Sequence, residues 1–181
     1  MNEFSTYEYV VQKKNKGKEK LKPAFLIIGY IIFALLALAF AVRSRLGAPL
    51  VALAPLALAL IIFLTWRYTK IEYEYSITSG ILTFSEIYGG KSRKTITEFS
   101  LKDCSMIAPL SDPDKRALAE RYNADISYVA LSQKDSPNTY FATFENERGK
   151  RCIFLFEATE RALKICRFYN PANTTVTKLP L

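Results

Sequence analysis

Two long apolar runs dominate the pattern of hydrophobic and polar positions along the chain. Residues 23–42 carry no charged side chain, and neither do residues 46–66. A helix rises about 1.5 Å per residue, so each run is long enough to cross the roughly 30 Å hydrocarbon core of a bilayer. Only Arg43, Ser44 and Arg45 separate the two runs. The pattern therefore predicts an antiparallel pair of transmembrane helices.

An alternative interpretation of the first run is a cleaved secretory signal, because Ala39-Phe40-Ala41 resembles a cleavage site. The run is longer than the roughly 7–15 residues of a signal core, and a second run follows at once. Basic residues flanking membrane spans favour the cytoplasmic side. The sequence therefore predicts a multi-pass protein of the cell membrane with both termini in the cytoplasm, on the side that carries Lys13, Lys14, Lys16, Lys18, Lys20 and Lys22.

Short alternating runs replace the apolar runs after residue 66. Ile71, Tyr73, Tyr75 and Ile77 alternate with polar residues, which is the period of a half-buried strand. Turn residues such as Ser79-Gly80 separate this run from the next. The pattern predicts about seven strands, over residues 71–78, 81–88, 94–100, 103–108, 125–131, 139–144 and 150–156.

Two helices are expected among these strands. Asp112 and Pro113 favour the start of a short helix that ends near Tyr122, and this capping role explains Asp112 and Asp114 without a metal ion. Thr159 favours a second helix, from Glu160 to Tyr169, whose apolar stripe consists of Ala162, Leu163, Cys166 and Tyr169. The predicted organisation is a basic segment, a helical hairpin, a soluble domain and a flexible tail, over residues 1–22, 23–66, 67–170 and 171–181.

The predicted fold class is α+β, in which a bent antiparallel sheet is closed at one end by the C-terminal helix. This order of elements resembles the pleckstrin-homology (PH) fold. With two spans ahead of the sheet, a lysine-rich N-terminus and the ending FEATERALKICRFYNP, the chain is similar to a small uncharacterised family of bacterial membrane proteins with a cytoplasmic PH-like domain. The family implies no catalytic activity.

Many PH domains bind phosphoinositides through basic residues on a long loop between their first two strands. The corresponding loop is expected to be Thr78-Ser79-Gly80, which is short and uncharged, so the resemblance does not carry an inositide site. Basic residues of the next turn remain as candidates for contact with lipid headgroups, together with the N-terminal lysines. These candidates are Lys91, Arg93 and Lys94.

The distribution of charge favours lipid over nucleic acid as the partner. The chain has a net charge of +8, but residues 67–181 carry 17 basic and 14 acidic side chains. Most of the excess therefore lies beside the predicted spans, where anionic headgroups attract it.

Catalytic chemistry finds little support. Histidine is absent, and Cys104, Cys152 and Cys166 form no CxxC pair and fall on apolar faces. We therefore expect no catalytic, cofactor-binding or metal-binding residue. The predicted function is a membrane-anchored interaction or scaffold module that binds a protein partner. The alternative is an accessory subunit of a larger membrane complex, in transport or in the envelope.

Overall fold

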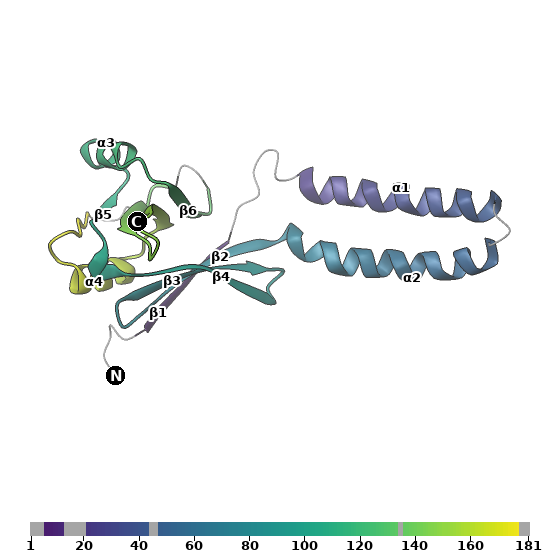
Figure 1. The fold of residues 1–181 in the computed structure, drawn as a ribbon, viewed down its shortest axis with the longest axis horizontal. Helices are drawn as coiled ribbons and strands as arrows, with labels where there is room; N and C mark the ends of the chain where they lie inside the picture. The colour runs from purple at the N-terminus through teal and green to yellow at the C-terminus, as the bar shows by residue number, and fades with distance from the viewer. Residues whose placement is uncertain (1–5, 13–20, 44–46, 134–135, 178–181) are drawn as a thin grey trace. The chain divides into compact units, whose positions relative to one another are not determined.

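The computed structural model describes residues 6–12, 21–43, 47–133 and 136–177 (Figure 1). Helices and strands follow one another in an order that places one strand before the two long helices and seven after them. The elements are β1 (Thr6–Gln12), α1 (Leu21–Arg43), α2 (Gly47–Trp66), the 3₁₀ turn η2 (Arg67–Thr69), β2 (Ile71–Thr78), β3 (Ile81–Tyr88), β4 (Ser92–Ser100), the 3₁₀ turn η3 (Leu101–Asp103), β5 (Met106–Pro109), α3 (Pro113–Arg121), β6 (Ile126–Ala130), β7 (Thr139–Glu145), β8 (Arg151–Glu157) and α4 (Glu160–Tyr169).

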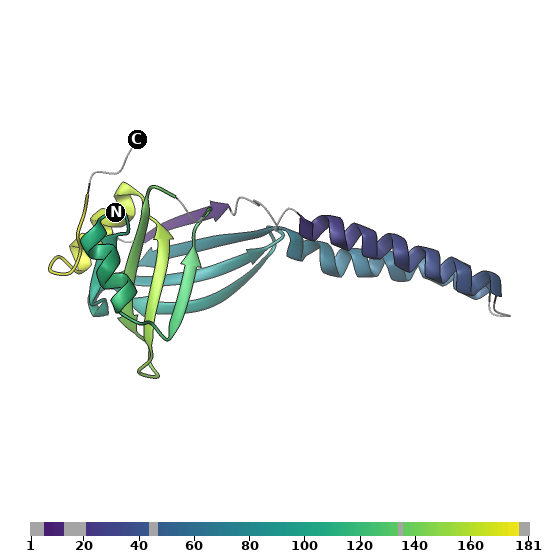
Figure 2. The same cartoon turned by 90° about the horizontal axis from the view of Figure 1, so that it is seen from above.

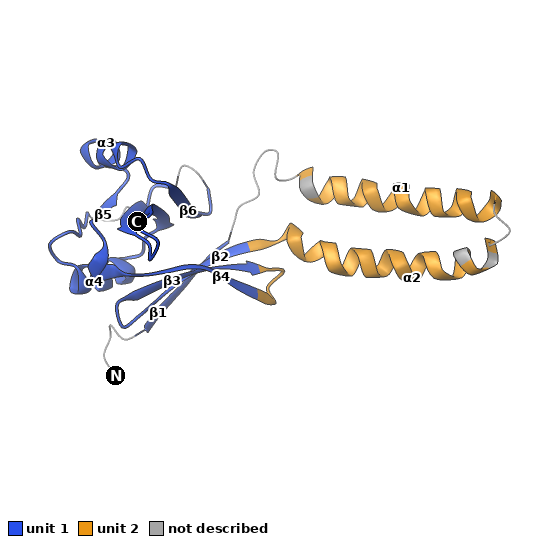
Figure 3. Cartoon of the chain, viewed as in Figure 1, with its two compact units in different colours: residues 1–14, 72–87, 93–181 blue, residues 15–71, 88–92 orange. Residues whose placement is uncertain are grey.

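Two compact units share the chain (Figure 3). The β unit consists of residues 1–14, 72–87 and 93–181. The helical unit consists of residues 15–71 and of residues 88–92, which form the turn between β3 and β4. The predicted soluble domain, residues 67–170, therefore has different boundaries in the structure, because its first residues and one of its turns belong with the helices.

The helical unit is an antiparallel hairpin whose apolar side chains point outward. Two segments are long and apolar enough to cross a membrane, Pro23–Arg43 and Val51–Thr69, and only 6% and 0% of their most apolar stretches are buried. A core helix of a water-soluble protein buries most of such a stretch, and neither helix is buried in that way. One polar link joins them, between the hydroxyl groups of Tyr30 and Thr65.

The first sheet has the strand order β1-β2-β3-β4 and includes a strand from the N-terminal segment. β1 is antiparallel to β2 along its whole length, from Thr6 opposite Thr78 to Gln12 opposite Glu72. This result corrects the prediction that residues 1–22 lie outside the domain. The reason is packing, because Val11 is only 2% exposed and Tyr7 and Tyr9 pack against the same core.

The connection between the first two strands is therefore not Thr78-Ser79-Gly80. Residues 13–70, with both long helices, lie between β1 and β2, and the short loop joins β2 to β3. Ser79 and Gly80 both have positive φ, at 51° and 84°, which suits a two-residue hairpin. A side chain at Gly80 would also collide with the ring of Tyr169, 2.6 Å away.

The second sheet has the order β5-β7-β8-β6, so the described strands number eight rather than about seven. β6 runs parallel to β8, which corrects the prediction of a wholly antiparallel sheet. β7 is antiparallel to β8 and lies on its other side. β6 and β7 run in opposite directions, as successive strands with a short connection do, so β6 must run parallel to β8. Figure 2 shows the strands of both sheets.

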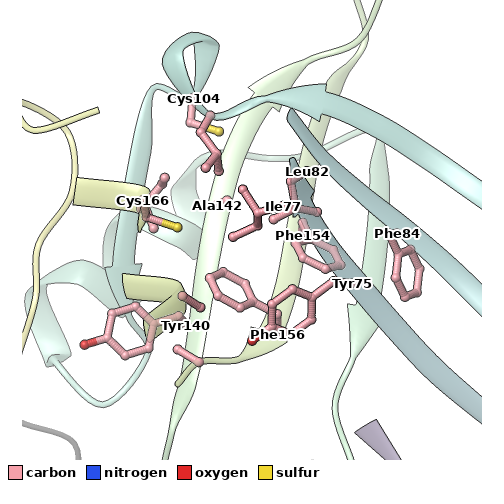
Figure 4. Packing of buried hydrophobic residues seen from close by; sticks show 14 of the residues in the cluster. Tyr75, Ile77, Leu82, Phe84, Cys104, Tyr140, Ala142, Phe154, Phe156 and Cys166 are labelled. Atoms are coloured by element: carbon pink, nitrogen blue, oxygen red, sulfur yellow. The ribbon is translucent and has the colours of Figure 1, made fainter. Parts of the chain in front are cut away.

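Aromatic rings fill the core between the two sheets (Figure 4). The ring of Tyr75 in the first sheet lies 5.5 Å from that of Phe156 in the second, and the rings of Phe84 and Phe154 are 5.2 Å apart. α4 adds a buried stripe that includes three of the four predicted residues. The stripe consists of Ala162, Leu163, Ile165 and Cys166, while Tyr169 is half-buried. The predicted closure by the C-terminal helix is confirmed.

The ends of the helices follow their capping residues. Asp112 accepts hydrogen bonds at the start of α3, and Thr159 accepts one from the amide of Ala162 at the start of α4. Asn170 ends α4 and is buried, and its amide nitrogen donates to the carbonyl oxygens of Leu101 and Cys104 at 2.9 and 2.8 Å.

Two predictions near η3 and the C-terminus are wrong in detail. The predicted strand at residues 103–108 begins only at Met106, because Leu101–Asp103 form a 3₁₀ turn. The predicted flexible tail pairs with β5, since Ile107 donates to Asn173 and accepts from Thr175, both at 2.8 Å. Residues 178–181 of that tail lie outside the described residues.

Candidate functional site

The structure describes four of the nine predicted headgroup contacts, at the end of the N-terminal lysine segment or outside it: Lys22, Lys91, Arg93 and Lys94. Lys13, Lys14, Lys16, Lys18 and Lys20 lie outside the described residues, and Lys22 lies in the first turn of α1. Lys91 is exposed in the turn between β3 and β4, and Arg93 and Lys94 lie on β4, also exposed. The structure therefore separates Lys91, which belongs to the helical unit, from Arg93 and Lys94, which belong to the β unit.

Arg93 forms ion pairs within the first sheet. Its guanidinium donates to Glu74 on β2 at 2.7 Å and to Glu8 on β1 at 3.1 Å. The side chain of Glu74 is only 4% exposed, although its place in the alternating pattern predicted a solvated face. Removing a carboxylate from water is costly unless it is paired, so Arg93 on β4 stabilises the first sheet by pairing with carboxylates on β1 and β2, beyond the intervening β3.

The Glu74 carboxyl is not a typical ion-pair partner. Burial raises its pKa above the ordinary value of 4.5, and the nearby Glu8 carboxyl raises it further, while Arg93 acts in the opposite direction. Arg93 therefore offsets only part of the cost of burying the Glu74 carboxylate, while the cluster links β1 to β2. We therefore interpret this cluster as structural.

A groove forms where α2 ends, within the helical unit. The last turns of α2, the turn η2 and residues 88–92 line an open groove of about 690 Å³. The amide of Gly89 donates to the carbonyl of Lys70 at 2.8 Å and fixes the turn against the helix end. Gly89 has a φ of +59°, and a Cβ atom there would lie 3.2 Å from Cβ of Arg67. Close approach and backbone conformation both require glycine at this position.

Aromatic rings and cations surround this helix-end groove. The Arg67 guanidinium lies 4.8 Å from the centre of the Tyr68 ring and donates to the Tyr68 hydroxyl at 2.7 Å. The Tyr68 ring meets the Tyr88 ring edge-on at 5.6 Å. These contacts hold Arg67 beside the groove and leave further N–H donors of its guanidinium for a ligand.

The lining of the groove changes from apolar to basic. Its apolar part follows α2 and consists of Ala59, Ile62, Phe63, Leu64 and Trp66. Its basic part consists of Arg67, Lys70 and Lys91, and no acidic residue is among the described residues that line it. An open groove that is apolar along the helix and carries three cations at its end suits an amphipathic anion.

The sequence indicated parts of this groove but not its assembly. Trp66 and Tyr68 follow the second apolar run directly, where interfacial aromatic residues are expected, and Lys91 was a predicted headgroup contact. Arg67 and Lys70 were not among the predicted headgroup contacts. Only the tertiary structure brings the turn at residues 88–92 to the helix end.

The three cysteines are structural. All are buried, and burial raises the pKa of each thiol, to about 12 for Cys166. A thiol must lose its proton to act as a nucleophile, so burial disfavours the reactive thiolate form of all three side chains. No group of three or more acidic or cysteine side chains that could hold a metal ion occurs within the described ranges.

Comparison with known proteins gives one family. The family model described as Bacterial PH-like domain (DUF6106) matches residues 3–175. No curated protein and no solved structure matches the chain. The matched range contains β1, both long helices and the two sheets, so the helices are part of what defines the family. The chain therefore belongs to the bacterial PH-like domain family.

Proposed function

We propose that the protein is a two-span integral membrane protein that holds a PH-like interaction module at the cytoplasmic face of the cell membrane and has no catalytic activity. The observation that carries this proposal is the outward exposure of apolar side chains along both long helices. Phe25 and Phe40 on α1 are 69% and 64% exposed, and Phe63 on α2 is 76% exposed. Apolar area left in water costs about 25 cal/mol per Å², so a continuous surface of this kind needs lipid around it.

The position of β1 argues against a cleaved signal. Cleavage after Ala41 would remove β1 from the first sheet and Val11 from the core. A signal peptide has no part in the mature fold, whereas β1 pairs with β2 along seven residues. The first helix is therefore retained in the proposed function.

The same pairing supports the proposed topology. β1 precedes α1, β2 follows α2, and the two strands are neighbours in one sheet. A pair of spans that starts and ends at adjacent strands must enter and leave the membrane on the same side. The six lysines ahead of the first span favour the cytoplasm as that side.

Labelling of introduced cysteines tests both parts of this topology. The native thiols are buried, so a membrane-impermeant maleimide should report only an added cysteine. In sealed cells we expect Ser44→Cys, between the spans, to react from outside. Ser111→Cys, which is exposed in the β unit, should react only after the membrane is opened. The reverse pattern would overturn the orientation, and release of the full chain by alkaline carbonate would overturn membrane insertion.

A protein partner is proposed for the β unit, at the outer edge of β6. Among the described strands β6 pairs with β8 alone, and its Ser127 and Val129 side chains are exposed. An edge strand can accept an extended peptide through backbone hydrogen bonds. β5, at the other end of this sheet, already pairs with residues 173–175 of the tail.

Photocrosslinking in cells tests this edge. A photoreactive residue at Val129 should capture one specific protein, while the same residue at Leu118 on α3, which is equally exposed, should not. Capture of the same set of proteins from both positions would count against a partner at β6. The full chain must be used, because residues 67–181 lack β1 and leave part of the core uncovered.

A further inference from the structure

We propose that the helix-end groove binds one anionic phospholipid, with the phosphate among Arg67, Lys70 and Lys91 and an acyl chain along the apolar face of α2. This inference rests on the proposed function, because it places the end of α2 at the membrane surface. It goes beyond it by assigning a ligand and a site to the helical unit.

The polarity of the groove matches the two ends of a phospholipid. Ala59, Ile62 and Phe63 present an apolar surface along the last turns of α2, and the three cations follow where the helix ends. No carboxylate among the described lining residues offsets these cations. Charge complementarity therefore selects an anionic headgroup over a zwitterionic one.

The depth of the groove also fits. α2 runs from Gly47 to Trp66, and about 20 helical residues span the roughly 30 Å of a hydrocarbon core. Arg67 and Lys70 then fall at headgroup level, next to Trp66 and Tyr68, which are of the residue types enriched at that level. The groove volume of about 690 Å³ admits a headgroup and part of an acyl chain, but not a folded partner.

The groove is partly formed before any lipid arrives. The Arg67 side chain is held by Tyr68, and the backbone of the turn that carries Lys91 is held by the hydrogen bond between the amide of Gly89 and the carbonyl of Lys70. A site whose guanidinium and backbone are already in place loses less freedom on binding than a fully mobile basic segment. A defined site is therefore expected rather than a diffuse basic surface.

Quenching of the single tryptophan measures this binding directly. Trp66 lines the groove and is the only tryptophan in the chain, so its fluorescence reports nearby brominated acyl chains. The full chain is reconstituted in phosphatidylcholine vesicles that contain a minor fraction of either brominated phosphatidylglycerol or brominated phosphatidylcholine. We expect the anionic lipid to quench the fluorescence of Trp66 roughly fivefold more strongly than its mole fraction predicts. The zwitterionic lipid should quench it in proportion to its own mole fraction.

Two pairs of variants assign the effect to the groove. Lys91→Gln should reduce the preference for the anionic lipid several-fold, whereas Lys94→Gln, the same change at an exposed residue of β4, should leave it unchanged. Ala59→Phe should fill the apolar part and abolish the preference, while Ala52→Phe, also exposed on α2 but away from the lining, should not.

Outcomes that overturn the lipid site differ from the outcome that overturns membrane insertion. Equal losses from Lys91→Gln and Lys94→Gln would show diffuse attraction and overturn the site. Quenching in proportion to mole fraction by both lipids would also overturn the site. So would a decrease in quenching of Trp66 as the protein density in the vesicles rises, because it would indicate that a second copy of the chain occupies the groove. Release of the chain from these vesicles by alkaline carbonate would instead overturn the proposed membrane insertion.

Discussion

The helical unit and the β unit use the same apolar residues in opposite ways. Phe63 on α2 is 76% exposed, whereas Phe154 on β8 is fully buried between the two sheets. The β unit hides its rings from water, as a soluble domain must. The helical unit leaves them outside, which is favourable in the apolar surroundings that the proposed membrane insertion provides. The comparison teaches that burial reports the solvent of a segment as much as its composition.

Polar groups obey one rule in both units. Thr65, within the apolar hairpin, donates to the carbonyl of Ile61 at 2.6 Å and is linked to Tyr30. Asn170, within the β unit, donates to two carbonyl oxygens. A polar group away from water needs a hydrogen-bond partner whether protein or lipid surrounds it.

Truncating a ring in each unit tests the comparison most strongly. Phe154→Ala should lower the free energy of unfolding of the β unit by about 3–5 kcal/mol, because it leaves a cavity among aromatic side chains. Phe63→Ala should leave that unfolding unchanged. Chemical denaturation of the detergent-solubilised chain, followed by circular dichroism, measures both. A comparable loss for Phe63→Ala would mean that α2 packs against protein.

A charge in the middle of α2 should prevent insertion rather than folding. Leu56→Asp places a carboxylate where lipid is expected, at a cost of about 3 kcal/mol for insertion. Leu118→Asp on α3, an exposed position in water, should have almost no effect. The membrane-bound fraction of each variant after cell lysis is the measurement. Normal recovery of Leu56→Asp in membranes would contradict a lipid-facing α2.

The Glu74 cluster offers a test within the β unit that depends on pH. The folded-state pKa of Glu74 lies above its ordinary value of 4.5, so the folded state binds this proton more tightly than the unfolded chain. The resulting stabilisation is complete below pH 4.5 and is lost as the pH rises through the folded-state pKa. As the pH rises through the folded-state pKa, the unfolding free energy of Glu74→Gln should therefore increase relative to that of the wild type. Below pH 4.5 the difference between the two unfolding free energies should not change with pH.

Arg93→Gln should lower the free energy of unfolding at neutral pH, whereas Glu74→Gln should raise it. It leaves Glu74 buried without its cation, and we expect a loss of about 1–3 kcal/mol. Lys94→Gln provides the control, because it removes one exposed positive charge from the same strand. Unfolding midpoints of the three chains at pH 7 give the comparison. Equal midpoints for both variants would show that Arg93 does not stabilise the sheet.

Two neighbouring glycines give the smallest expected effect. Gly89→Ala and Gly90→Ala both place a side chain at positive φ, but only the first brings a Cβ atom against Arg67. Gly89→Ala should cost about 1 kcal/mol more than Gly90→Ala, because crowding adds to the strain of the backbone. The emission maximum of Trp66, together with the thermal midpoint, shows whether the turn has left the helix end. Identical results for the two variants would mean that the close approach of Gly89 to Arg67 does not contribute to stability.

Much of the fold could be predicted because its signals are local. The charge-free runs, the alternation around Tyr75, the caps at Asp112 and Thr159 and the stripe of α4 each depend on neighbours within a few residues. The strand at Thr6–Gln12 also alternates, but polar residues and both apolar runs separate it from its partner, β2. Its pairing depends on residues about 65 positions away, which no local pattern contains.

By itself, the sequence determined which two segments are long and apolar enough to cross a membrane, and where most of the strands and all four helices lie. Only the tertiary structure decided that β1 joins the domain, that both long helices lie between two paired strands of one sheet, that Arg93 pairs with Glu74 and that Lys91 lies at the end of α2. The physical reason is that hydrophobic period and capping act over a few residues, whereas pairing, burial and charge complementarity act between segments that the fold brings together.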